Sequence, residues 1–74
     1  MTKYEQDIIQ IAEFYGVKAL FNDDGELVIT YKQLGMGSII AGKINDLMHE
    51  KYPEVDYSLS IKHGDMTVVV RIDK

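Results

Sequence analysis

The residues of this chain that could do chemistry are its carboxylates, its two histidines and one glycine-containing segment. The 74 residues hold twelve acidic and eight basic side chains and no cysteine, and the net charge is −4. His49 and His63 are far apart in the sequence, and their spacing does not pair either with a nucleophile or with metal ligands. We therefore expect no catalytic residue, no metal site and no cofactor in a protein that is not an enzyme.

The segment from Gly37 to Ile44 comes within one residue of the phosphate-binding loop pattern, which ends in glycine, lysine and then serine or threonine. Ile44 occupies the position of the magnesium-binding hydroxyl. A parallel nucleotide-binding sheet also needs a longer chain. The segment therefore predicts the entry into a helix, and not a nucleotide site.

Residues 22–26 form an acidic segment with the sequence Asn-Asp-Asp-Gly-Glu. It lacks the alternating ligand spacing and the distal glutamate of a calcium loop. Asparagine, aspartate and glycine are typical of tight turns. Asparagine and aspartate side chains form hydrogen bonds with the nearby backbone, and glycine accepts positive φ. We predict a hairpin turn between two short strands, residues 17–21 and 26–32.

The clearest structural pattern lies in residues 55–73, where apolar and polar side chains alternate on both sides of His63-Gly64. This period of two predicts a β-hairpin with one buried face. The apolar members are Val55, Tyr57, Leu59, Ile61, Met66, Val68, Val70 and Ile72. A hairpin of this kind needs helices to cover its apolar face.

Two helices are predicted. Thr2 and Glu5 have the spacing of a capping box, and Gly16 is typical of a helix end, so we expect a first helix over residues 2–15. The second helix should begin with Ser38 as its N-cap and stop before Pro53. We expect Gly42, in its interior, to allow close packing against the first helix or a partner.

The order of elements is thus α-β-β-α-β-β, which predicts one α+β domain over residues 1–74. A four-stranded antiparallel sheet with both helices on one face satisfies every apolar stripe. The alternative is an intertwined dimer in which the hairpins of two chains form one larger sheet. The inward residues of the first hairpin should be Val17, Ala19, Phe21, Leu27, Ile29 and Tyr31.

The opposite, open face of this sheet is expected to carry Lys18, Lys32, Lys62 and Arg71 with Glu26, Asp56 and Asp73, a net charge of +1. The remaining surface carries nine acids against four bases. Leu20, Val28 and Val69 should form an apolar patch on the open face. Such a patch favours self-association, so we predict a homodimer.

Segments for export or membrane insertion are not evident. No apolar run approaches the ~20 residues that span a bilayer, and the N-terminus lacks the order of a signal peptide. We expect a cytoplasmic protein.

In size, acidity and lack of cysteine, and in the acidic segments 23–26 and 50–56, the chain resembles the small acidic host-takeover proteins of lytic bacteriophages. Among these, it is similar to those that inhibit the bacterial nucleoid protein HU. The resemblance implies a dimeric DNA mimic, working in the host cytoplasm, that binds HU and displaces it from DNA. The contact carboxylates would be Asp23, Asp24, Glu26, Asp46, Glu50, Glu54 and Asp56.

A different function would use the open sheet face. Lys18, Lys32, Lys62 and Arg71 could contact the phosphates of a nucleic acid, and the same face could serve as a protein-interaction module. The net charge of −4 opposes nucleic-acid binding, and no exposed aromatic pair is expected there to stack on bases. DNA mimicry by the carboxylates is therefore the leading hypothesis.

Overall fold

The computed structural model describes residues 1–73 and confirms the α+β class and the order α-β-β-α-β-β. The two helices are longer than the strands of the first hairpin, and the second hairpin is longer than the first. The elements are α1 (Lys3–Phe14), β1 (Lys18–Phe21), β2 (Leu27–Thr30), α2 (Met36–Lys51), β3 (Tyr57–Lys62) and β4 (Thr67–Ile72).

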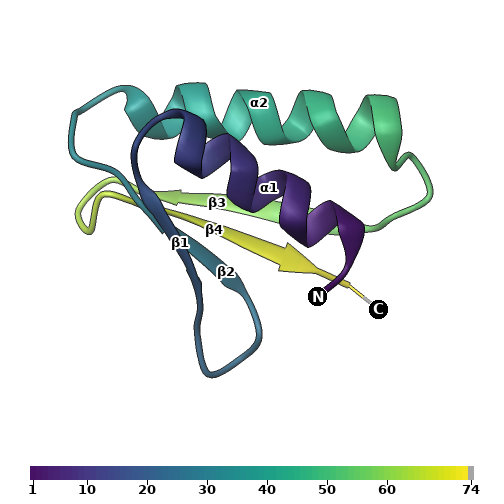
Figure 1. Ribbon diagram of the computed structural model, residues 1–74. Coiled ribbons are helices and arrows are strands. Elements are labelled where there is room, and N and C mark those ends of the chain that lie inside the picture. The colour runs from purple at the N-terminus through teal and green to yellow at the C-terminus, as the bar shows by residue number, and fades with distance from the viewer. Residues whose placement is uncertain (74) are drawn as a thin grey trace.

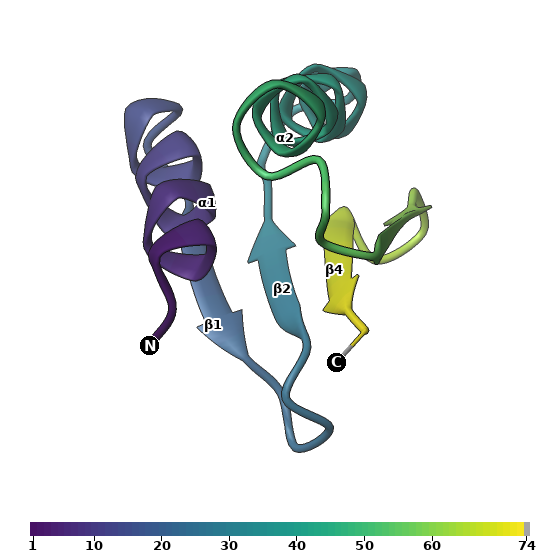
Figure 2. The ribbon, with the colours of Figure 1, turned by 90° about the vertical axis from the view of Figure 1, so that its right-hand side faces the viewer.

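The four strands form one antiparallel sheet in the order β1-β2-β4-β3. Pairing of β2 with β4 joins the two hairpins, so that β1 and β3 are the edges. Both helices lie on the same side of the sheet (Figure 1), and the end-on view of Figure 2 shows α1 near β1 and α2 above the other strands. The prediction of helices on one face is confirmed.

Helix α1 begins and ends as its sequence predicts. The Thr2 hydroxyl accepts a hydrogen bond from the Glu5 backbone N–H at 3.2 Å, and the Glu5 carboxylate accepts from the Thr2 N–H at 2.8 Å. Gly16, just after the helix, has φ of +72°, a backbone conformation that residues with a Cβ rarely adopt. Ile8 and Ala12 of this helix are fully buried.

Helix α2 begins three residues earlier than predicted, at Met36, and its N-cap is Gly35 with φ of +90°. The prediction of Ser38 as the N-cap is wrong, and Ser38 lies in the first turn. Because Gly35 reverses the chain without a side chain, the helix starts where the backbone can turn rather than where a hydroxyl could cap it.

The two glycines of α2 differ in their surroundings. A Cβ at Gly37 would lie 2.6 Å from Cε1 of the buried Tyr31 ring, whereas a Cβ at Gly42 would meet no atom within 4 Å. The expectation that Gly42 packs closely against the first helix is therefore wrong. The close approach occurs at Gly37, where the helix rests on the Tyr31 ring.

The core lies between the helices and the inner face of the sheet. Ile40, Ile44 and Met48 of α2 are fully buried against the inward strand residues Leu27, Ile29, Val68 and Val70. No polar or charged side chain among the described residues is buried. Phe21, which was predicted to face inward, remains 43 % exposed, and it is the last residue of the edge strand β1, next to the β1–β2 turn.

The β1–β2 turn is a side-chain-supported turn. The Asn22 carboxamide oxygen accepts hydrogen bonds from the backbone N–H groups of Asp24 at 3.0 Å and Glu26 at 2.9 Å. Gly25 has φ of +79°. The prediction of a plain hairpin turn is confirmed.

We predict opposite effects of alanine at the two helix glycines. Gly42→Ala should stabilise the protein by about 1 kcal/mol, since alanine is the better helix former and the space is open. Gly37→Ala gains the same propensity, but its methyl group collides with Tyr31, and overpacking of this kind costs about 1–3 kcal/mol. The free energy of unfolding from urea denaturation should therefore be lower for Gly37→Ala than for Gly42→Ala. Equal values for the two variants would contradict the contact with Tyr31.

Candidate functional site

The two histidines lie at different places in the fold. His49 is on α2 with its ring 6.1 Å from the ring of Tyr57, and His63 is in the β3–β4 turn. No group of three or more His, Cys, Asp or Glu side chains among residues 1–73 is placed to hold a metal ion.

The segment that resembles a phosphate-binding loop is part of α2. Gly37 through Ile44 lie within the helix, whose first residue is Met36. A phosphate-binding loop needs its glycines in an irregular backbone that wraps the phosphate, and only its end enters the helix. The arrangement agrees with the prediction of a helix entry and does not form such a loop.

The closest grouping of ionisable side chains joins the two helices. The Asp7 carboxylate on α1 accepts hydrogen bonds from the Tyr52 hydroxyl at 2.5 Å and from the Lys51 ammonium at 3.1 Å. The rings of Tyr4 and Tyr52 also meet edge to face, with centroids 5.8 Å apart. These contacts connect the start of α1 to the end of α2.

The electrostatics of this grouping favour a structural role. The hydrogen bond from Tyr52, together with that from Lys51, lowers the pKa of Asp7. The hydrogen bond to Asp7 raises the pKa of Tyr52 and that of Lys51. A tyrosine or lysine with a raised pKa holds its proton more firmly, so neither is activated as a base or nucleophile.

Tyr57 is a second tyrosine whose hydroxyl is bound within the fold. It is half-buried, and its hydroxyl donates to the Asn45 carboxamide oxygen at 2.6 Å. Burial, with a contribution from the Asp46 charge, raises the pKa of Tyr57. Its hydroxyl, like that of Tyr52, is thus engaged within the fold.

The seven predicted contact carboxylates divide into three groups. Asp23, Asp24 and Glu26 lie in or beside the β1–β2 turn, and Glu54 and Asp56 lie in the connection from α2 to β3. Asp46 and Glu50 are on α2, where with Lys43 they line a groove of about 470 Å³ between the helices. Because α2 and the β1–β2 turn are at opposite sides of the molecule (Figure 1), the seven do not form one continuous surface.

The strands show the predicted alternation on the open face, but four of the seven charged residues predicted for it, Glu26, Lys32, Asp56 and Asp73, lie outside the strands. The outward side chains of the strands are Lys18, Leu20, Val28, Thr30, Ser58, Ser60, Lys62, Thr67, Val69 and Arg71. None of these ten is aromatic. Leu20, Val28 and Val69 are cross-strand neighbours in register, because Leu20 pairs with Val28 and Val28 with Val69.

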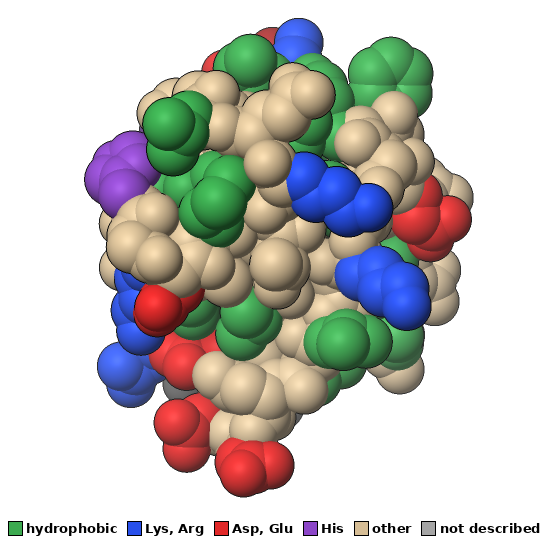
Figure 3. Space-filling model, turned by 90° about the vertical axis from the view of Figure 1, so that its left-hand side faces the viewer, with side chains coloured by type: hydrophobic (Ala, Val, Ile, Leu, Met, Phe, Trp, Pro, Cys, Tyr) green, Lys and Arg blue, Asp and Glu red, His purple; other side chains and the backbone are tan. Residues whose placement is uncertain are grey.

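Charges on this face are separated along the strands, which the sequence alone did not show. Lys18 and Lys62 lie in the row nearest the β3–β4 turn, where Lys18 pairs with Thr30 and Lys62 with Thr67. Figure 3 looks onto that end: basic side chains cross the middle of the view, and carboxylates gather below, where the β1–β2 turn lies. The strand register shows where along the sheet each charged side chain lies, and so reveals that the basic and acidic side chains are separated.

We predict that Asp7→Asn lowers the stability of the protein near neutral pH and not in strong acid. The folded pKa of Asp7 lies below its ordinary value of 3.8, so the ionised carboxylate stabilises the fold above that pH. This stabilisation is lost as the pH falls through the folded pKa. Urea denaturation of the wild type and Asp7→Asn should show a difference near pH 7 that shrinks below pH 4. A difference that stays constant into acid would contradict the role of the Asp7 charge.

The open sheet face and the three carboxylate groups are the surfaces on which a function can be based. None of the helices in residues 1–73 is long and apolar enough to cross a bilayer. Comparison with protein families, with curated proteins and with solved structures finds no match for this chain. The inference of function therefore rests on the charges and contacts of the chain itself.

Proposed function

We propose that this protein is a non-enzymatic, cytoplasmic binding protein that inhibits a basic DNA-binding protein, with nucleoid protein HU as the expected partner. Its exposed carboxylates would occupy the positions of DNA phosphates on that partner. The partner's lysines and arginines would then be neutralised by protein carboxylates, and DNA would be displaced by competition for the same site.

The observation that carries the proposal is that none of these carboxylates forms an ion pair among the described residues. The described residues form two ion pairs, Lys51 with Asp7 and Arg71 with Asp73, and neither uses any of the seven predicted contact carboxylates. Six of the seven are exposed, and Glu26 is half-buried. Their negative charge is therefore available to a partner.

The α2 group is the better candidate for a repeated phosphate-like contact. Asp46 and Glu50 are four residues apart on one helix, which places them about one turn, or ~6 Å, apart along the axis. Glu54 follows shortly after the helix end. Lys43 lies one turn before Asp46 and reduces the local negative charge at that end.

The β1–β2 turn offers a second contact that is separate from the first. Asp23 and Asp24 are exposed at its tip, and the hydrogen bonds to Asn22 hold the backbone there in one conformation. A rigid turn loses little conformational entropy on binding. Since the two groups lie on opposite sides of the molecule, one copy of the chain would present only one of them to a given groove.

We predict that reversal of the α2 charges abolishes most of the binding to HU. The double variant Asp46→Lys and Glu50→Lys should bind purified HU at least about tenfold more weakly than the wild type, because like charges would face each other. The affinity of the wild type should also fall steeply with salt concentration, since screening weakens contacts between exposed charges. Titration calorimetry at several salt concentrations measures both effects.

The matched control is the double variant Glu13→Lys and Asp65→Lys, which changes the net charge by the same amount at exposed acids outside the three groups. It should retain clearly more affinity than the α2 variant. The corresponding variant Asp23→Lys and Asp24→Lys shows whether the turn contributes. Binding that does not depend on salt, or an equal loss in the control, would contradict recognition by these carboxylates.

A further inference from the structure

The open face of the sheet has an apolar centre and two charged ends. Leu20, Val28 and Val69 form one cross-strand row that ends at Ser60 on β3, and we call it the apolar row. Leu20 is 66 % exposed. Small polar side chains, such as Thr30 and Thr67, fill the next row and leave the centre without bulky obstructions.

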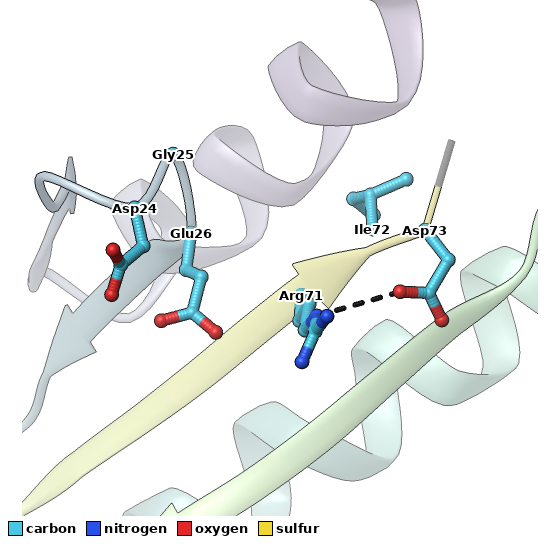
Figure 4. A pocket seen from close by; sticks show the side chains of 6 residues that line it. All are labelled: Asp24, Gly25, Glu26, Arg71, Ile72 and Asp73. Atoms are coloured by element: carbon cyan, nitrogen blue, oxygen red, sulfur yellow. Dashed lines mark ion pairs between the residues drawn. The ribbon is translucent and has the colours of Figure 1, made fainter.

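The two ends of this face carry opposite charge. The basic end has Lys18 and Lys62 on the two edge strands. At the acidic end, Asp24, Glu26 and Asp73 line a hollow of about 660 Å³ around Arg71, and Figure 4 shows Glu26, Arg71 and Asp73 turned to one side of the sheet and Ile72 to the other. Asp56 is also at this end, since its carbonyl oxygen accepts from the Asp73 N–H at 2.9 Å.

We propose that a second copy of this chain packs on the open face, in a face-to-face pair whose two-fold axis crosses the strands along the apolar row. This rotation places each apolar row on its counterpart and the basic end of each copy over the acidic end of the other. By the strand register, Lys18 then lies over the Asn22 position of the second copy, next to Glu26, and Lys62 lies over Ser58. Sheets that pack face to face lie about 10 Å apart, a gap that lysine and glutamate side chains span together.

The charges also exclude the other face-to-face arrangement. A two-fold axis parallel to the strands would bring Lys18 over Lys62 of the second copy and the acidic ends over each other. It would also place Leu20 over Ser60 and not over an apolar side chain. Like charges in direct opposition are destabilising, so the face is complementary to itself in one orientation only.

The size of the face indicates a weak dimer. Four strands at ~4.8 Å spacing and about six residues at ~3.3 Å rise give a plane of roughly 20 by 20 Å. This is about half of the ~800 Å² per partner in a standard interface, which places the pair among the weak, transient interfaces. An apolar centre with charged ends matches the usual division of an interface into core and rim.

This inference is independent of the α2 part of the proposed function, whereas Glu26 and Asp56 would lie at the interface of the pair instead of contacting the DNA-binding protein. In the pair, the helices lie on the two outer sides, so Asp46 and Glu50 stay accessible. Variants of Lys18 should change self-association and leave the α2 carboxylates unchanged, and failure of one proposal does not imply failure of the other.

The test is an exchange of charge between two positions that are distant within one chain. Lys18→Glu should weaken self-association at least about tenfold, because two pairs of acids would face each other across the dimer. Glu26→Lys should weaken it similarly through facing lysines. The double variant Lys18→Glu and Glu26→Lys has the net charge of the wild type and should restore the wild-type affinity. Sedimentation equilibrium, at concentrations up to about 300 µM, covers the range expected for so small an interface.

One control keeps this test decisive. Glu26 accepts a hydrogen bond from Asn22 at 2.9 Å, so thermal denaturation must first show that each variant is folded. A monomeric wild type at 300 µM, or a double variant no stronger than the single ones, would overturn the proposal. Edge-to-edge pairing would give the second outcome, because it does not bring Lys18 to Glu26.

Discussion

The pairing of β4 on both of its edges is the constraint on which the rest of the structure depends. β4 is the last strand in the sequence, yet it lies between β2 and β3 and thereby joins the two hairpins into one sheet. Val68 and Val70 are fully buried beneath the helices, while Val69 and Arg71 point to the open face. A shift of this strand by one residue would exchange the two sets: Arg71 would be buried, and Val68 and Val70 would be exposed. The register of β4 therefore determines both the core and the composition of the outer surface.

Much of the fold could be predicted because several local patterns agree. The alternation in residues 55–73 defines the second hairpin, the Thr2 and Glu5 spacing defines the start of α1, and both are present in the structure. The errors occur where a tertiary contact, and not a local preference, decides the outcome. Gly35 starts α2 before Ser38, and the Tyr31 ring requires glycine at position 37 and not at 42. These contacts join residues whose relation does not appear as a period or a motif.

The candidate site was harder to predict than the fold, for a related reason. Sequence alternation assigns each charged side chain to a face, but it gives no position along the sheet. That position follows from register, which sets Lys18 beside Thr30 and Lys62 beside Thr67. The carboxylates show the same limitation. Asp23 and Asp46 are both exposed, and only the three-dimensional arrangement shows that the turn and α2 lie on opposite sides.

The two proposed surfaces have a physical connection. A single copy would present one carboxylate group at a time to a basic groove, whereas a face-to-face pair would carry two copies of the α2 group on its outer sides. Two linked contacts bind more tightly than one when one partner, or two partners held together, can engage both, because the second contact forms at a high effective concentration. The dimer interface that provides this gain in affinity can be weak, because the two copies need to stay together only while the partner is bound. Self-association on the open face would thus compensate for the separation of the carboxylates within one small chain.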